Sequence, residues 1–231
     1  MQTAAPPRYA IYYTPPAGPL ADFGAAWLGW DCAHGCALPH PQIDGVPRQI
    51  ADITETPRKY GLHGTLKPPF HLADGCDETG LIAALEHVSA MLKPAILDRL
   101  ELAQLGRFIA LIPRGETTGL ANIASALVEG LDGFRAPPSA AEIARRNPAH
   151  LNDAQRRHLE RWGYPYVFDQ FKFHITLTGK LPKAEATQTC KVLAPLLAPI
   201  LPAPFEVREV TLLRSDHAGR FVQIARVPLG G

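Results

Sequence analysis

The chain carries the same four-residue motif twice, and the pattern that follows each copy also matches. His-x-Thr-Leu stands at residues 63–66 and again at residues 174–177, an offset of 111 residues (174 less 63). Gly-Arg-Phe stands at residues 106–108 and at residues 219–221, an offset of 113 (219 less 106). Two anchors whose offsets agree this closely indicate a structural repeat. Its units cover about residues 60–114 and 170–228.

Both units have the same order of predicted elements, strand–helix–strand–strand. The motif strand is followed by an amphipathic helix with apolar residues at i, i+4, i+7 and i+11: Leu81, Leu85, Val88 and Leu92, then Ala186, Cys190, Leu193 and Leu197. Pro195 is expected to kink or end the second helix. Apolar runs on both sides of each Gly-Arg-Phe predict hairpins over residues 96–113 and 205–228.

The segments outside the repeat complete the predicted fold. They indicate a strand over residues 8–14, helices over 20–30 and 119–131, and a helical stretch over 140–162 that Pro148 interrupts. Helices that alternate with sheets built largely from hairpins indicate an α+β protein. We expect a single bilobal domain over residues 1–231. Its two lobes, with antiparallel-rich sheets flanked by helices, are related by a pseudo-twofold axis around a central cleft.

Composition excludes several classes of protein. Of the 231 residues, 46% are hydrophobic, enough for a sizeable core, and 23 Lys+Arg against 22 Asp+Glu leave a net charge of +1. A chain so nearly neutral does not coat DNA or an acidic membrane, although one local phosphate pocket stays compatible with it. No run of about 18 apolar residues predicts a membrane span. The N-terminal segment lacks the features of a secretion signal, and four scattered cysteines indicate a reducing cytoplasm rather than a disulfide scaffold.

The two motifs place polar groups on one face of their strands. Residues i and i+2 of a strand point the same way, so His63 lies with Thr65 and His174 lies with Thr176. The alternate positions are apolar and belong to the opposite, buried face: Leu62, Leu66, Phe173, Ile175 and Leu177. A pseudo-twofold axis then brings both pairs together around one small cavity.

Two imidazoles and two hydroxyls suit in-line displacement at a phosphodiester. A neutral histidine takes a proton from the attacking water while a protonated one gives a proton to the leaving oxygen, and both forms coexist near neutral pH. Threonine hydroxyls donate hydrogen bonds to the non-bridging oxygens. This chemistry requires no metal and no cofactor. Which histidine, His63 or His174, is the acid stays open.

The segments around both motifs resemble a known superfamily. RKYGLHGTLKPPF and RWGYPYVFDQFKFHITLTGK are similar to two-histidine (2H) phosphoesterases, which include RNA ligase-like and cyclic phosphodiesterase members. More narrowly, they resemble a bacterial branch of uncharacterised proteins associated with phosphonate-utilisation operons. The resemblance implies a bilobal fold with a central cleft, His63 and His174 as acid and base, Thr65 and Thr176 as phosphate ligands, and a cyclic phosphate ester as substrate. At Gly64 the relatives more often have alanine, which is also small.

Other residues have a functional and an ordinary interpretation. Lys67 and Lys172 are an even number of residues from His63 and His174, so in a strand they point to the same face as the histidines. Both are candidate substrate-binding residues at the cleft rim, or ordinary surface lysines. Tyr164 and Tyr166 stack on a base or sugar, or pack in the core. Cys32, His34, Cys36 and His40 lack the spacing of a zinc site, and a small-residue loop is the better interpretation. The arginines of residues 145–161 indicate a solvated face, or less simply a polyanion site.

The sequence therefore predicts a metal-independent phosphoesterase that opens a cyclic phosphodiester, a 2′,3′-cyclic nucleotide or a ribosyl cyclic phosphate, to a monoester. The partner is a small phosphorylated substrate, with an RNA terminus as a second option. Three alternatives stay open: a non-catalytic phosphate or nucleotide-binding protein, an RNA end-processing or ligase-like enzyme, and a metal-dependent hydrolase using His63, His71 and His174. His71 follows two prolines and is expected to lie off the strand. The oligomeric state stays open.

Overall fold

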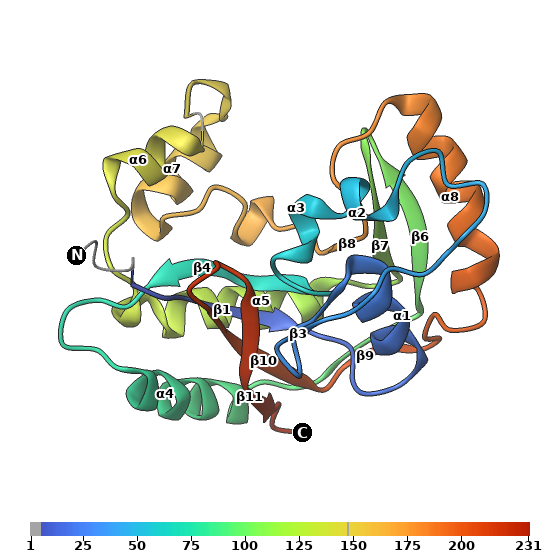
Figure 1. Ribbon diagram of the computed structural model, residues 1–231. Helices are drawn as coiled ribbons and strands as arrows, with labels where there is room; N and C mark the ends of the chain where they lie inside the picture. The colour runs from blue at the N-terminus through green and yellow to red at the C-terminus, as the bar shows by residue number, and fades with distance from the viewer. Residues whose placement is uncertain (1–5, 147) are drawn as a thin grey trace.

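The computed structural model describes residues 6–146 and 148–231, and it is built around one antiparallel sheet (Figure 1). Seven strands form this sheet in the order β11-β10-β1-β4-β8-β7-β6. Their bounds are β1 Arg8–Tyr13, β4 Gly64–His71, β6 Arg99–Leu105, β7 Phe108–Arg114, β8 Ile175–Thr176, β10 Glu209–Ser215 and β11 Phe221–Pro228. Two small sheets pair β2 (Trp30–Asp31) with β3 (Cys36–Ala37), and β5 (Ala95–Leu97) with β9 (Phe205–Val207).

Helices alternate with the strands along the chain. The α-helices are α1 Pro19–Leu28, α2 Ile50–Ile53, α3 Glu55–Arg58, α4 Glu78–Ala90, α5 Thr118–Gly130, α6 Ala140–Arg145, α7 Asp153–Trp162 and α8 Lys183–Leu197. Short 3₁₀ helices lie at Asp132–Phe134, Pro148–His150 and Phe168–Gln170. The predicted α+β class is confirmed. Over residues 6–146 and 148–231, no helix is long and apolar enough to cross a membrane.

Each motif strand lies in the half of the sheet that contains the hairpin of the other sequence unit. β4 carries the first motif, but the strands beside it are β1 and then the β10–β11 hairpin of the second unit. β8 lies beside the β7–β6 hairpin of the first unit. Helix α4 accordingly packs on β10 and β11, and α8 packs on β6 and β7. Each half of the sheet is therefore built from both sequence units.

The turns of both hairpins need the glycine of Gly-Arg-Phe. Gly106 has φ 62° and Gly219 has φ 79°, in the left-handed region that residues with a Cβ enter at a cost. The repeated tripeptide thus marks the same backbone geometry in both hairpins.

Two local features differ from expectation. Pro195 does not end helix α8, which continues to Leu197. Pro195 and Lys191 are exposed, so water can bind the Lys191 carbonyl that the proline leaves without a donor. His71 is the last residue of β4 and not off it. The strand accommodates its two prolines by a shift in register, from Ile11 opposite Lys67 to Tyr9 opposite Phe70.

Apolar packing differs on the two faces of the sheet. The main core fills the side covered by α4, α5 and α8, with Leu85, Leu127 and Leu193 fully buried. A second, small cluster lies on the other face, formed by Ala10, Tyr12, Trp30, Cys32, Leu213 and Phe221. His63 lies on this small cluster, because Tyr12 stacks on its ring.

The two halves of the sheet meet at one residue pair. Gly64 of β4 lies opposite Ile175 of β8, the single Cα pair between these strands. The Phe173 ring occupies the space next to Gly64, where an added Cβ would lie 2.2 Å from its Cζ atom. The Trp27 indole donates a hydrogen bond to the Leu177 carbonyl (2.8 Å) and holds β8 from the other side. With Phe173 in this position, close approach of the half-sheets favours glycine at position 64.

We expect Gly64→Ala to lower the free energy of unfolding by about 1–3 kcal/mol, because the methyl group overpacks against Phe173. Gly133→Ala is the matched control, since nothing lies within 4 Å of an added Cβ there, and a change of about 0.5 kcal/mol or less is expected. Urea denaturation measures both. The cost of Gly64→Ala should shrink in a Phe173→Leu background; an equal cost in both backgrounds would contradict the steric explanation.

Candidate active site

The junction of β4 and β8 brings both motifs to one place. Gly64 lies opposite Ile175 in an antiparallel pair, so the same register sets His63 opposite Thr176 and Thr65 opposite His174. Each histidine therefore lies across from the threonine of the other motif. Both histidines stand one residue before their strands, at equivalent positions of the two units.

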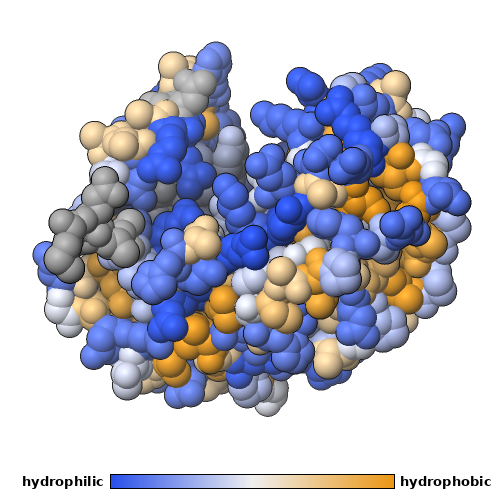
Figure 2. Space-filling model, in the orientation of Figure 1, coloured by the Kyte–Doolittle hydropathy of each residue, from blue (hydrophilic) through white to orange (hydrophobic). Residues whose placement is uncertain are grey.

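Two adjoining cavities surround these four side chains, and together they form what we call the central cleft. The His63 cavity, about 220 Å³, is lined by Tyr12, Tyr60, His63, Thr65 and Thr176 among others. The His174 cavity, about 480 Å³, is lined by Thr65, Phe108, Tyr164 and His174 among others. Thr65, Pro68 and Tyr164 belong to both linings. Figure 2 shows the surface deeply hollowed between the α6–α7 segment and the half that carries α8, with hydrophilic residues along both walls.

The backbone holds both imidazoles in the same way. His63 Nδ1 is 2.9 Å from the Gly61 carbonyl oxygen, and His174 Nδ1 is 2.9 Å from the Lys172 carbonyl oxygen. A carbonyl accepts and never donates, so each Nδ1 carries the hydrogen. Nε2 is then the ring nitrogen that can take up or release a proton. The two histidines are equivalent in tautomer as well as in position.

Their surroundings are not equivalent. The His63 ring stacks on Tyr12, with centroids 4.1 Å apart, and Tyr60 lies at 5.4 Å. Loss of hydration between these rings lowers the pKa of His63 to about 4; the hydrogen bond to Gly61 opposes this shift and the nearby His174 adds to it. The aromatic ring beside His174 is that of Phe108, and the two ring centroids are 5.8 Å apart. His63 is therefore neutral at pH 7.

Lys67 does not reach the cleft, and that prediction was wrong. Tyr12 lies opposite Thr65, but Ile11 lies opposite Lys67, so β4 has one more residue than β1 here. This bulge turns the following side chain to the other face. Lys67 is 2% exposed and its ammonium donates to the Val128 carbonyl (2.9 Å). Burial lowers the pKa of Lys67 to about 8.

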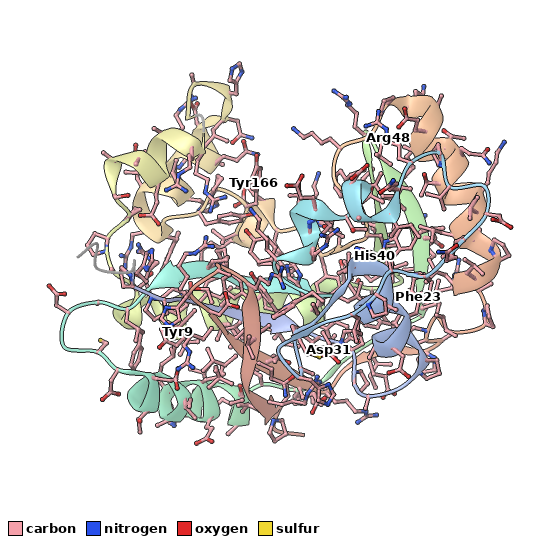
Figure 3. All side chains as sticks on the ribbon, viewed as in Figure 1. Tyr9, Phe23, Asp31, His40, Arg48 and Tyr166 are labelled. Atoms are coloured by element: carbon pink, nitrogen blue, oxygen red, sulfur yellow. The ribbon has the colours of Figure 1, made fainter. Side chains whose placement is uncertain are left out.

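The other predicted residues lie at the cleft. Lys172, Tyr164 and Tyr166 line the His174 cavity. Tyr164 is half-buried and meets Tyr166 edge-on at 5.7 Å. Tyr166 is 47% exposed, and Figure 3 places it at the rim, facing the gap between α7 and α3. The tyrosines thus form a partly open aromatic wall rather than a core layer.

The metal-binding alternatives find no support in geometry. Within residues 6–146 and 148–231, no three or more His, Cys, Asp or Glu side chains are grouped to hold an ion. His71 lies apart from the motif histidines, with Nδ1 3.1 Å from the Pro7 carbonyl. In the cysteine loop, His34 binds Asp31 (2.7 Å) and His40 Nδ1 lies 3.0 Å from the Trp27 carbonyl oxygen.

Several residues at the cleft had no role in the sequence prediction. Tyr12 and Tyr60 are the rings that desolvate His63, and Phe108 faces His174. Arg8 and Arg146 line the His63 cavity. The one available signal was the alternation of residues 8–14, which sets Tyr12 on the face opposite Ile11 and Tyr13. The remaining contacts depend on tertiary structure.

Comparisons with known proteins show the family of this chain. The family model "Protein of unknown function (DUF1045)" matches residues 65–222. A protein of Janthinobacterium sp. (strain Marseille) named "Ribose 1,5-bisphosphate phosphokinase PhnN" is 35% identical over 97% of this chain and 51% of its own length. The chain thus spans about half of that relative.

Solved structures give weaker matches. The protein TT0787 of Thermus thermophilus is 17% identical with a TM-score of 0.46, over 97% of this chain and 98% of that one. E. coli LigT complexed with 3′-AMP is 19% identical with a TM-score of 0.44, over 98% and 100%.

We expect an NMR titration of the imidazole nitrogens to give His63 a pKa near 4, because Tyr12 and Tyr60 exclude water from the ring. Unfolded, the same histidine titrates near 6.5. Between pH 6.5 and 4 the unfolded chain therefore binds more protons than the folded chain. The contribution of His63 to the free energy of unfolding is complete above pH 6.5 and is lost as the pH falls toward 4. Between pH 7 and pH 4, the free energy of unfolding should fall by on the order of 2 kcal/mol more in the wild type than in His63→Gln. Equal losses would show that the ring is solvated.

Proposed function

The chain belongs to the DUF1045 family, and we propose that it is a metal-independent phosphoesterase that opens a cyclic phosphodiester to a phosphate monoester. The substrate class is a ribosyl cyclic phosphate or a 2′,3′-cyclic nucleotide. His63 and His174 exchange protons with the reacting oxygens, and Thr65 and Thr176 hold the phosphate.

One observation carries this proposal: the crossed arrangement of His63 with Thr176 and of Thr65 with His174 around one cleft. This diagonal placement of the histidines supports attack on a bound phosphate from one side and departure from the other, as in-line displacement needs. The threonine hydroxyls of the same cleft suit the non-bridging oxygens. The paired motifs also support the resemblance to 2H phosphoesterases.

The reaction balances with these groups alone. Nε2 of neutral His63 accepts a proton from water as the water oxygen forms a bond to phosphorus. The bond from phosphorus to one ring oxygen breaks, and that oxygen takes a proton from Nε2 of protonated His174. The product is a monoester with a new hydroxyl, and proton exchange with solvent restores both histidines.

The difference in environment supports one distribution of the two roles. His63 is packed between aromatic rings that keep the pKa of its imidazole low, at about 4, so it enters the reaction neutral and serves as the base. His174 faces the wider cavity, where water can supply its proton, and it serves as the acid.

The name of the curated relative supports a phosphorylated ribose as substrate. Its phosphokinase activity is not carried over, because this chain matches only about half of that protein. The chain also has no Gly-x₄-Gly-Lys-Ser/Thr loop, the motif with which P-loop enzymes hold nucleotide phosphates. The relative's name further supports the proposed link to phosphonate metabolism.

A ³¹P NMR assay tests the proposal. Chelator-treated enzyme is incubated with 2′,3′-cyclic AMP and with a ribose 1,2-cyclic phosphate, and we expect the cyclic resonance of at least one to become a monoester resonance. His63→Ala and His174→Ala should each lower kcat by about 10²–10⁴-fold. Binding of the cyclic phosphates without turnover by the wild type would favour a phosphate-binding protein. Activity lost on chelation and restored by metal would favour the metal-dependent alternative.

The pH dependence of kcat/KM tests the two roles. We expect a bell-shaped profile in which the acidic limb lies near pH 4, because protonation of His63 removes the base. The Tyr12→Leu variant opens the ring stack to water and should move this limb upward, toward 6.5. A rate independent of pH from 3 to 9, or an acidic limb that does not move in Tyr12→Leu, would contradict the assignment.

A further inference from the structure

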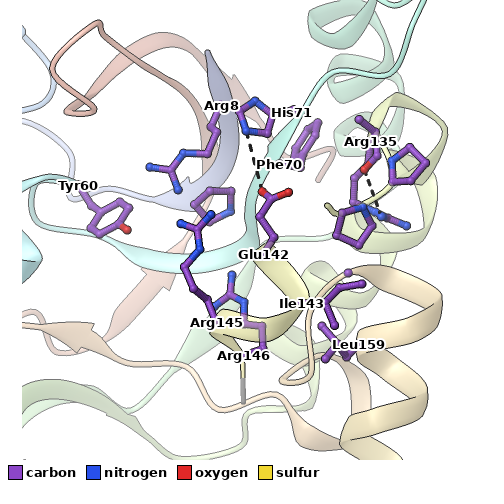
Figure 4. Close-up of a pocket in the computed structure, with 15 residues that line it drawn as sticks. Arg8, Tyr60, Phe70, His71, Arg135, Glu142, Ile143, Arg145, Arg146 and Leu159 are labelled. Carbon is purple, nitrogen blue, oxygen red and sulfur yellow. Dashed lines mark hydrogen bonds and ion pairs between the residues drawn. The ribbon is translucent and has the colours of Figure 1, made fainter. Parts of the chain in front are cut away.

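A third cavity adjoins the central cleft on the side of His63, and we call it the arginine cavity. Its volume is about 250 Å³, and three of its lining residues are Arg8 from β1 and Arg145 and Arg146 from the end of α6. Arg8, Tyr60, Pro69 and Arg146 line both this cavity and the His63 cavity. Figure 4 shows Arg8 and the Arg145–Arg146 pair on either side of the space beside Tyr60. The two cavities thus share one wall.

Among the residues that the structure describes, the three guanidinium groups form no ion pair. The described residues include every Asp and Glu of the chain, and the salt bridges among them involve nine other arginines: Arg48, Arg99, Arg114, Arg135, Arg156, Arg161, Arg208, Arg214 and Arg226. Three cations without an ion pair, against one carboxylate in the same lining, raise the local positive potential in a chain of net charge +1.

Two of these arginines are oriented by ring faces. The Arg146 guanidinium lies 4.6 Å above the Tyr164 ring and the Arg8 guanidinium 5.4 Å from the Phe221 ring. A cation over a ring face is attracted to that face and keeps its N–H donors available for an anion. Arg145 is exposed and donates through Nε to its own helix, to the Ala141 carbonyl (3.3 Å).

The one carboxylate of the cavity lining is already engaged. Glu142 accepts hydrogen bonds from the Ser139 backbone (2.9 Å) and the Ser139 hydroxyl (2.8 Å), which closes a capping box at the start of α6. Its other oxygen lies 3.9 Å from His71. The Ser139 hydrogen bonds, and after them the charges of His71 and Arg145, lower the pKa of Glu142. Glu142 is thus near Arg145 but forms no ion pair with any of the three arginines, and an anionic ligand would supply that partner.

We propose that the arginine cavity is a second anion subsite, which binds a phosphate group of the substrate other than the one that reacts. This inference rests on the proposed function. Guanidinium groups match the oxygens of a phosphate monoester in pairs, and each such charge-assisted hydrogen bond is stronger than a neutral one. Because the subsite shares its wall with the His63 cavity, both phosphates belong to one small molecule, a phosphorylated sugar that also carries the cyclic phosphate.

A binding experiment tests the subsite without turnover. Inorganic phosphate is titrated into the protein at constant ionic strength, with chloride as the reference anion, while the arginine ¹H–¹⁵Nε resonances are recorded. We expect the resonances of Arg8, Arg145 and Arg146 to shift with saturation, and Arg145→Gln/Arg146→Gln to weaken this binding at least tenfold. Thr65→Val/Thr176→Val should leave it in place. Arg157→Gln, an exposed arginine of α7, is the matched control. Shifts that are absent, or that chloride reproduces, would overturn the subsite.

A kinetic experiment connects the subsite to the substrate. The ratio of kcat/KM is measured for ribose 1,2-cyclic phosphate with and without a phosphate on its 5-hydroxyl. We expect wild type to favour the doubly phosphorylated compound about 100-fold, which corresponds to two charge-assisted hydrogen bonds. Arg145→Gln should lower this ratio about tenfold, and Arg157→Gln should not change it.

The two experiments separate the two proposals. Phosphate binding at the arginines without turnover of either compound would refute the phosphoesterase and leave the anion site. Turnover with a ratio near one, unchanged in Arg145→Gln, would refute the substrate subsite and leave the phosphoesterase. A melting temperature for each variant within a few degrees of the wild type excludes misfolding as the cause.

Discussion

The active site depends on one backbone pairing, Gly64 opposite Ile175, which joins two half-sheets. The same register that closes the sheet sets each motif histidine across from the other motif's threonine. A side chain at position 64 would displace Phe173, which fills the space beside Gly64 and packs in turn on Tyr13 and Phe205. Sheet closure and assembly of the four polar groups are thus one event in this fold.

Exchange of the hairpins reinforces that dependence. Since β4 lies in the half-sheet with β10 and β11, and β8 in the half-sheet with β7 and β6, neither sequence unit has a complete half of its own. The pair β5–β9 crosses between the units as well, from Ala95 opposite Val207 to Leu97 opposite Phe205. A lobe cannot form from one unit alone, and the relative position of the two histidines is therefore set by the whole chain.

Local pattern was enough to predict the repeat, the main helices and hairpins, the α+β class and the two motif pairs, because these follow from periodicity and turn residues. Three features lay beyond it. The bulge that buries Lys67 depends on how β4 pairs with β1. Which hairpin joins which motif strand depends on pairing across more than 100 residues. The position of Arg145 and Arg146 beside the cleft depends on how α6 folds back over β4, and in the sequence they are ordinary exposed arginines.

The repeated and the unrepeated parts of the chain contribute different residues to the cleft. The repeat supplies what is symmetric: two imidazoles held through Nδ1 by a carbonyl two residues earlier, and two hydroxyls. Segments outside it break the symmetry, since Tyr12 of β1 packs His63 tightly, Arg8 and Arg146 add positive charge on that side, and Tyr166 adds an aromatic wall on the side of His174. In a symmetric site either histidine could activate the water that attacks the phosphate, whereas these surrounding residues favour one of the two directions of attack. For the proposed substrate this asymmetry favours one orientation, with the charged end beside His63 and the less polar end beside His174.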